Sequence, residues 1–355
     1  MKQKKKFCLM LTLFVTAQLA MAHTPAYPSA ACIPERPDAP QTLVPMGNAI
    51  GIQIHAGGVM ITALTPVDTE NGDCSPALEA GMAAGDTITH VNKKQVDNAK
   101  DFFEAIQRTR GADLTLRGRR DDSPLSVRLK AVRAQSDERY RIGAWVRDSM
   151  AGIGTVTFYN PANGDFGALG HGIHEAETNR LMPLARGSAA PASIVDVRRG
   201  QAGSPGELRG SFDLNKPSAS LYANTANGIF GTVEKGFPAG NAALPIGRPE
   251  DATVGKAVLY SQVQGDTVCE YGIEISRVAN GNDGRNMLFR VTDQRLLSAT
   301  GGIVQGMSGS PIVQNGKIIG AVTHVLINDP QRGYGIFITN MLADNNKPAP
   351  LEKAA

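Results

Sequence analysis

Apolar and polar residues alternate in short runs along most of this chain, and turn residues separate the runs. Gly, Pro, Asn and Asp interrupt stretches of β-branched and other apolar residues, which predicts short strands joined by tight turns. Such runs occupy residues 49–54, 59–64, 87–91, 152–159, 192–197, 228–233, 256–263, 271–278 and 287–291. Residues 180–290 lack a long helical period, so the pattern favours a β-barrel or paired barrels in the second half of the chain.

The first 42 residues have a different pattern. Lys2 and Lys4–Lys6 precede an apolar stretch, Phe7–Met21, and Ala20-Met21-Ala22 has the small-x-small form of a signal peptidase site. We therefore expect residues 1–22 to be a cleaved signal peptide, with an uncleaved membrane anchor as the alternative. Residues 23–42 are rich in Pro and Ala and predict a flexible spacer. In both cases the body of the protein is expected to be exported.

Length, charge and cysteine spacing limit the number of domains and the classes of ligand that the protein could bind. A chain of 355 residues suggests more than one domain, and the net charge of +3 is spread along the chain, which gives no argument for nucleic acid. Cys8 would leave with the signal. Cys32, Cys74 and Cys269 remain, at no metal-ligand spacing, and the sequence does not choose a disulfide pair among them. We expect no metal and no cofactor.

A segment in the first half carries a specific motif. Residues 75–88 read SPALEAGMAAGDTI, with a Pro just after a Ser cap and Gly-Asp opening the next strand. Residues 96–106 follow as an amphipathic helix capped by Asn98, with an apolar face of Phe102, Phe103 and Ile106. The run resembles bacterial PDZ domains, over residues 43–133. The resemblance implies an α+β module that binds an extended peptide, and it assigns the binding loop to Ala49, Ile50, Gly51 and Ile52.

A candidate nucleophile lies near the C-terminus. Residues 301–313 read GGIVQGMSGSPIV, where glycines surround Ser308 and an apolar strand follows from Pro311. A serine nucleophile needs an uncrowded Oγ and backbone N–H groups turned toward the oxyanion, and Gly306 and Gly309 permit that backbone. The motif is not the Gly-x-Ser-x-Gly elbow, because a strand and not a helix follows it. A plain Gly/Ser turn is the alternative.

His171 is the candidate base. It lies between two glycines at the end of an apolar run, Phe166–Gly170, which leaves room for the imidazole. His174 is the alternative, although its polar neighbours indicate a surface position. His324, beyond the hairpin at Asn315-Gly316, is expected to line or support the site. For the third group of a triad, Asp293 and Asp165 are both candidates; spacing alone favours a strand-end cap for Asp293.

These motifs, in this order, resemble trypsin-like serine peptidases and, more closely, the stage IV sporulation protein B peptidase family. The matching segments are residues 167–173, 291–293, 301–311, 320–325 and 328–330. The resemblance implies a trypsin-like double β-barrel over residues 141–345 after the PDZ domain, hence a mainly β protein. It assigns His171, Asp293 and Ser308 to a catalytic triad, with the N–H groups of Gly306 and Ser308 as the oxyanion hole.

The resemblance also implies a biological role. Members of the family are exported from the forespore into the space between two membranes, where they cleave themselves and a membrane-bound regulator. The expected partners are therefore protein or peptide substrates, other copies of the chain for self-cleavage in trans, and a membrane-protein regulator. Members carry a membrane-spanning anchor, whereas residues 1–22 here have the form of a cleavable signal. The alternative function is an exported PDZ adaptor with an inactive peptidase domain.

Overall fold

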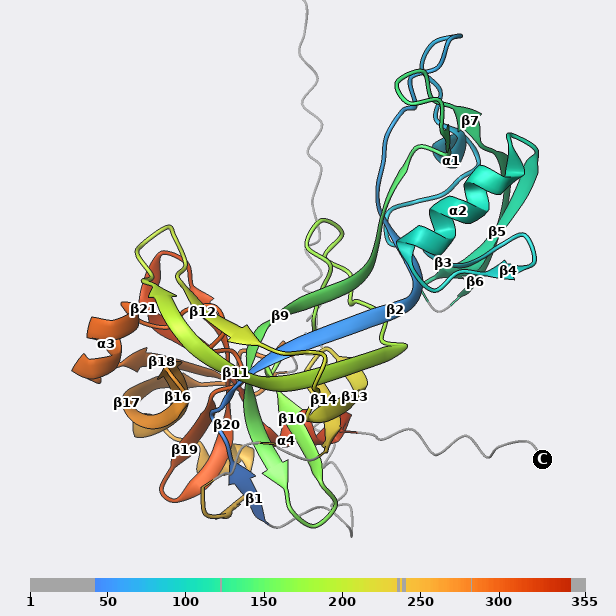
Figure 1. Cartoon of the computed structure of the whole chain (residues 1–355). Helices are drawn as coiled ribbons and strands as arrows, with labels where there is room; N and C mark the ends of the chain where they lie inside the picture. Colours follow the sequence, from blue (N-terminus) through green and yellow to red (C-terminus); the bar gives the residue numbers. More distant parts are fainter. Residues whose placement is uncertain (1–41, 122, 235–236, 238–240, 282, 346–355) are drawn as a thin grey trace, which may run out of the picture. The chain divides into compact units, whose positions relative to one another are not determined.

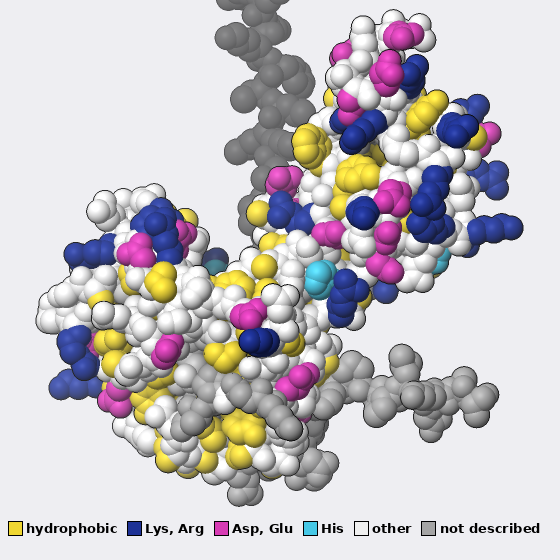
Figure 2. All heavy atoms as spheres, viewed as in Figure 1, with side chains coloured by type: hydrophobic (Ala, Val, Ile, Leu, Met, Phe, Trp, Pro, Cys, Tyr) yellow, Lys and Arg dark blue, Asp and Glu magenta, His cyan; other side chains and the backbone are white. Residues whose placement is uncertain are grey.

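The computed structural model describes residues 42–345, except 122, 235–236, 238–240 and 282 (Figure 1). The predicted signal peptide or anchor, Cys32 and all of the predicted spacer but Thr42 lie outside these residues. Cys74 and Cys269 are both free thiols. Strands dominate the described residues, as expected from the short apolar runs. Figure 2 shows acidic and basic side chains interspersed over the visible face, consistent with the mixed charge of the sequence.

A first set of strands closes a circuit of pairings, which we call the first barrel. Its order is β9-β10-β14-β13-β11-β2, and an additional pairing between β9 and β2 completes it. The strands are β2 (Ala49–Leu64), β9 (Ala144–Asn160), β10 (Asp165–Ala168), β11 (Arg186–Arg198), β13 (Ala219–Thr225) and β14 (Gly228–Val233). β1 (Thr42–Pro45) extends the sheet between β9 and β15 (Leu244–Pro245), and β12 (Glu207–Phe212) pairs with β11.

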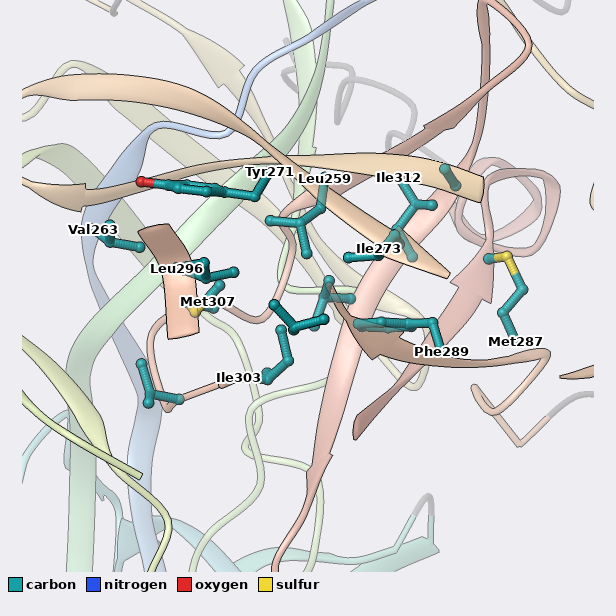
Figure 3. Close-up of a cluster of buried hydrophobic side chains, with 14 of the residues drawn as sticks. Leu259, Val263, Tyr271, Ile273, Met287, Phe289, Leu296, Ile303, Met307 and Ile312 are labelled. Carbon is teal, nitrogen blue, oxygen red and sulfur yellow. The ribbon is translucent and has the colours of Figure 1, made fainter. Parts of the chain in front are cut away.

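A second, closed barrel has the order β16-β17-β18-β21-β20-β19. The strands are β16 (Gly255–Gln264), β17 (Thr267–Val278), β18 (Met287–Val291), β19 (Pro311–Gln314), β20 (Lys317–Leu326) and β21 (Asp329–Phe337). Side chains such as Leu259, Ile273, Phe289 and Ile312 fill its interior and are buried (Figure 3). The first and second barrels together confirm the predicted double-barrel peptidase fold.

The short helices of this half follow from local sequence signals. Asp293 caps α3 (Gln294–Thr300), which ends at Gly301 in the left-handed conformation. α4 (Ile338–Asp344) follows β21, and η1 (Pro249–Asp251) precedes β16. Across the described ranges, no helix is long and apolar enough to cross a bilayer.

The third part is PDZ-like and has its own core. β3 (Thr87–Val91), β5 (Asp113–Arg120) and β6 (Ser123–Lys130) continue the sheet from β2, with β4 (Lys94–Gln95) paired to β3. α1 (Pro76–Glu79) and α2 (Ala99–Thr109) pack on this sheet, and β7 (Val132–Arg133) pairs with β8 (Tyr140–Arg141). The helix predicted within residues 96–106 is confirmed, and Asn98 caps α2 by accepting from the N–H of Asp101.

Strands β2 and β9 belong both to the first barrel and to the PDZ-like part (Figure 1). They pair along almost their whole length, from Ala49 opposite Thr155 to Leu64 opposite Ala144. Ile50, Ile52 and Ile54 join the core of the first barrel, whereas Val59 and Ile61 join the PDZ-like core. The packing therefore begins the PDZ-like part near residue 57 and not at the predicted residue 43. It is an insertion between two strands of the first barrel.

Candidate active site and peptide groove

Ser308 lies on a loop that is hydrogen-bonded to strand β9. Gly306 and Gly309 both have φ of +97°, a region that favours glycine. A Cβ on Gly309 would lie 2.0 Å from the carbonyl oxygen of Thr155, so only glycine fits there. Thr155 fixes the loop in turn, because its hydroxyl donates to the Gly306 carbonyl at 2.7 Å and its N–H donates to the Ser308 carbonyl at 3.0 Å.

The N–H groups of Gly306 and Ser308 are left without a partner among the described residues. By contrast, the intervening Met307 N–H donates to Val304, and the Gly309 N–H donates to Val322. Gly306 and Ser308 both line the same pocket, which has a volume of about 520 Å³. Two unpaired donors, two residues apart and beside a serine, form the arrangement that stabilises an oxyanion in acyl transfer.

His171 lies in the same pocket, at the end of the first barrel where β10 finishes. Leu169 and Gly170 both have φ of +69°, and this turn leads the chain to the imidazole. Nδ1 of His171 lies 2.8 Å from the carbonyl oxygen of Gly172. Since a carbonyl can only accept, Nδ1 carries the proton in the neutral ring and Nε2 is free to accept one. This is the tautomer that a general base requires.

The environment of His171 favours the neutral imidazole. Burial lowers the pKa of His171, and the nearby His174 lowers it further, while the hydrogen bond to Gly172 acts in the opposite direction. A base that is neutral near pH 7 can accept a proton from serine. His174 lines the same pocket, but its side chain is exposed, and its Nδ1 lies 3.1 Å from the same carbonyl. The choice of His171 as the base stays a prediction.

Ser308 and His171 are brought together, but the hydroxyl has another partner. Ser308 Oγ donates to the carbonyl oxygen of Thr323 at 2.8 Å. His324 follows on β20, and its ring centroid lies 5.3 Å from that of His171, as expected for a residue that lines the site. Although His324 is partly open to solvent, desolvation in the pocket lowers its pKa to about 4, helped by His171 and Arg285.

Asp293 is engaged elsewhere. Its carboxylate accepts from the Arg295 side chain at 2.7 Å and from the Arg295 N–H at 2.9 Å, and so caps α3. The hydrogen bonds to Arg295 lower the pKa of Asp293 to about 2, against the effect of partial burial. The pocket that holds His171 and Ser308 does not include Asp293. The structure thus supports the cap that spacing alone favoured, and the triad role of Asp293 stays a prediction from the family resemblance.

Asp165, the other candidate carboxylate, serves the turn before β10. It accepts from Asn163 and from the Thr232 hydroxyl, at 2.9 and 3.1 Å. Asn224 is a positioning residue that the sequence did not reveal. Its amide accepts from the Ile173 N–H and donates to the carbonyls of Ile173 and Met182, which closes the loop after His171. Only its place before an Asn-Gly turn in β13–β14 could have drawn attention to it.

A separate groove, of about 770 Å³, lies in the PDZ-like part between α2 and the start of β9. Phe103 from α2 and Trp145 from β9 line it, and both are exposed. Asp148 ties the two walls together, because its carboxylate accepts from the Ala99 N–H at the start of α2. One side of this part of β9 pairs with β2, and the groove lies on the side toward α2. An open strand edge beside a helix suits an added peptide strand.

The prediction of the peptide-binding loop is wrong. Ala49, Ile50, Gly51 and Ile52 lie within β2, which pairs with β9 over all four residues and with β11 over the last three. Their backbone is therefore already used in the first barrel, and they do not line the groove. Ile142, Gly143, Ala144 and Trp145 line the groove instead. The family resemblance assigned the loop to residues that precede the groove helix, whereas β9, the strand that lines the groove, follows that helix in the chain.

Over the part of the chain that the structure describes, no three His, Cys, Asp or Glu side chains are grouped to hold a metal ion.

Comparisons with solved structures return serine proteases. The Rv3671c protease from M. tuberculosis, in its active form, is 16% identical over 57% of this chain and 77% of that chain, with a TM-score of 0.32. The HtrA-type protease AlgW with a decapeptide is 16% identical over 55% and 51%, with a TM-score of 0.32. A thermostable serine protease, AL20, from an extremophilic microorganism is 14% identical over 55% and 92%, also at 0.32. No curated protein matches the sequence.

Family models give the stronger result. A PDZ domain model matches residues 73–120, within the PDZ-like part. A model of SpoIVB peptidase S55 matches residues 138–342, which is more than half of the chain and includes His171, Asp293 and Ser308. Together with a double barrel, a serine beside two unpaired N–H groups and a histidine in the tautomer of a base, this match identifies the chain as a PDZ-containing serine peptidase that belongs to the SpoIVB peptidase S55 family.

Proposed function

We propose that this chain is an exported serine endopeptidase that cleaves itself and a membrane-associated regulatory protein in a sporulation signalling pathway. One observation carries the catalytic part of the proposal. The unpaired N–H groups of Gly306 and Ser308 line the same pocket as a His171 ring whose Nε2 is free to accept a proton. The sporulation pathway and the regulatory substrate follow from the family.

In the proposed mechanism, the Ser308 hydroxyl leaves the Thr323 carbonyl and donates to Nε2 of His171. The oxygen then attacks the scissile carbonyl while His171 takes the proton. The N–H groups of Gly306 and Ser308 stabilise the oxyanion, and each such donor contributes about 3–4 kcal/mol to transition-state stabilisation. His171 next gives the proton to the leaving amine, and water releases the acyl group by the same steps in reverse order.

The Gly172 carbonyl performs part of the orienting role in this conformation, since it fixes the proton on Nδ1 of His171. The family resemblance assigns that role to Asp293, which would first have to exchange its contacts with Arg295. We propose the groove between α2 and β9 as the site that holds a peptide segment of a substrate, or of another copy of the chain. Such tethering raises the local concentration of substrate without taking part in the chemistry.

The experiment is labelling of purified protein, residues 23–355, with a fluorophosphonate probe, beside the variants Ser308→Ala and His171→Ala. Labelling of the wild type alone supports an activated Ser308. For self-cleavage, full-length Ser308→Ala protein serves as the substrate and wild-type protein as the enzyme. Cleavage within residues 23–48, located by N-terminal sequencing, supports action in trans. An intact substrate after prolonged incubation with labelled, active enzyme contradicts it.

An exported adaptor with an inactive peptidase domain is the second candidate. The hydrogen bond of Ser308 to Thr323 and the ion pair of Asp293 with Arg295 favour it, because each of these two side chains is engaged with a partner other than His171. The same labelling decides between the two: a folded wild-type protein that takes up no probe, with or without peptide in the groove, supports the adaptor.

A further inference from the structure

The loop that follows His171 folds around one buried carboxylate, Glu175. Its side chain has an exposed fraction of 0%. One oxygen, Oε2, accepts from the N–H groups of Glu177 and Thr178, at 3.1 and 2.8 Å, and from the Thr178 hydroxyl at 3.0 Å. The Glu175 backbone adds bonds to Arg180 and Asn179. The carboxylate is therefore the centre of residues 174–180.

The Glu175 loop is hydrogen-bonded to Ile173, which follows closely after His171 in the chain. The Met182 N–H donates to the Ile173 carbonyl at 2.9 Å, and the Asn224 amide bonds to both residues. Ile173 is two positions from His171. Whatever fixes the loop therefore also fixes the backbone that leads to the imidazole.

The second oxygen of Glu175 faces Arg147. Oε1 lies 3.2 Å from Nε of Arg147, and both atoms are buried and make no hydrogen bond within the described residues. The electrostatic attraction between the two charges thus offsets the cost of burying these two atoms. Burial would raise the pKa of Glu175, but the hydrogen bonds from Thr178 and Glu177 and the charge of Arg147 outweigh it and lower the pKa. The carboxylate stays ionised, which is the state that an arginine partner requires.

Arg147 lies on β9, the strand that also contacts the peptide groove and the loop of Ser308. It comes two residues after Trp145 in the groove, opposite Met60 of β2. Thr155 of the same strand holds the loop of Ser308. β9 therefore contacts both the loop of Glu175 and the loop of Ser308.

We propose that Arg147 is a positioning residue for His171: its guanidinium neutralises Glu175, and the loop built on that carboxylate sets the imidazole relative to Ser308. The inference rests on the proposed catalytic roles of His171 and Ser308. It adds an ionic link between the strand at the edge of the peptide groove and the base.

The test compares five variants with the wild type: four single variants and the double variant Arg147→Met/Glu175→Gln. Arg147→Met removes the charge and keeps most of the volume, Arg147→Lys keeps the charge, and Glu175→Gln removes the other partner. Arg133→Met is the matched control, because Arg133 forms an exposed ion pair with Glu138 at 2.8 Å in the PDZ-like part. The rate of fluorophosphonate labelling reports the activation of Ser308, amide hydrogen exchange of residues 173–182 reports the loop, and thermal unfolding reports the fold.

We expect Arg147→Met and Glu175→Gln each to slow labelling by at least tenfold and to speed exchange in residues 173–182. We expect the double variant to be no slower than the slower single variant, because the two residues act as a unit. Arg147→Lys restores labelling to within about threefold of the wild type, a rescue that a purely steric role would not produce. Arg133→Met labels and exchanges like the wild type.

Wild-type labelling rates in Arg147→Met overturn the inference, and so does unchanged exchange in residues 173–182. If Arg147→Met does not fold, Arg147→Lys and Glu175→Gln decide by the same two measurements. A wild type that takes up no probe contradicts the proposed catalytic roles, and hence the positioning of a base, whereas the exchange data separately accept or reject the link from Arg147 to the loop.

Discussion

Ser308 Oγ donates its hydrogen bond to the carbonyl oxygen of Thr323, 2.8 Å away, while the free nitrogen of His171 lines the same pocket. The serine hydroxyl is thus bonded to β20 of the second barrel and not to the candidate base from the first. Attack on a substrate requires one change of partner at the hydroxyl. Catalytic hydrogen bonds that form only with substrate present are common in peptidase-like sites.

Replacement of Ser308 by alanine tests the nucleophile. We expect Ser308→Ala to abolish labelling and cleavage and to lower the free energy of unfolding by only about 1 kcal/mol, the usual effect of losing one hydrogen bond. Labelling rate and chemical denaturation measure the two effects. Ser310→Ala is the matched control, because Ser310 is buried and bonds to Ser261 instead of facing the pocket. Cleavage by Ser308→Ala at the wild-type rate would contradict the proposed role of Ser308 as the nucleophile.

Asp293→Asn separates the helix cap from the triad role. Because the carboxylate caps α3 and pairs with Arg295, we expect the free energy of unfolding to fall by about 1 kcal/mol. We expect the labelling rate of the folded protein to stay within about tenfold of the wild type. A loss of about 10⁴-fold, typical of a triad carboxylate, would instead show that Asp293 reaches His171 in the reactive state.

The pH dependence of labelling follows from His171. Its pKa is lowered from 6.5, and the neutral imidazole is the active form. The rate should therefore rise with pH through a midpoint below 6.5 and remain level through neutrality. An acid midpoint at or above 6.5, measured with a probe that does not itself titrate, would contradict the burial of the ring as the structure has it.

Stability should also fall in mild acid because of His324. Its pKa is about 4 in the folded chain, against 6.5 when it is free. Between these values the unfolded chain binds a proton that the folded chain does not, so the folded state loses stability as the pH falls through this window. His324→Gln should weaken this dependence in denaturation curves recorded from pH 7 to pH 4. Identical curves for variant and wild type would exclude this contribution.

Peptide binding in the groove can be followed without a label, because Trp145 is the single tryptophan of the chain and lines the groove. We expect an extended peptide with an apolar C-terminus to shift its emission to shorter wavelength as the indole loses water. Phe103→Ser, on the opposite wall, should weaken binding at least tenfold. Ile50→Val, within the first barrel, is the control and should leave affinity unchanged. Equal affinity for all three proteins would rule out this groove.

Much of the fold could be predicted, because local signals and tertiary structure agree in most places. The strand at 287–291, the capped helix after Asn98 and the glycine loop around Ser308 all follow from patterns of a few residues. The pairing of Ile50 was beyond such patterns: the same apolar-glycine run suits a binding loop and a buried barrel strand, and only the neighbours β9 and β11 distinguish them.

The site divides in a similar way. Ser308 and His171 stand out in the sequence because glycines flank them. Asn224 and Arg147 do not, since each acts through a loop distant in sequence. The contacts of Asp293 depend on Arg295 two residues away, and a carboxylate beside an arginine reads equally well as a cap or as a catalytic group.

The shared strand β9 has a practical consequence. Its first residues form the edge of the peptide groove, and its last ones hold the loop of Ser308. A fragment that ends at residue 133 therefore lacks one wall of the groove, and a fragment that begins at residue 141 lacks β1 and β2, two strands of the sheet that carries His171. Neither half is a self-sufficient unit. If a protease cleaved the chain between residues 133 and 141, the two fragments would stay associated through the pairing of β2 with β9. Replacing the PDZ-like part by another domain would require two junctions, one in β2 and one in β9.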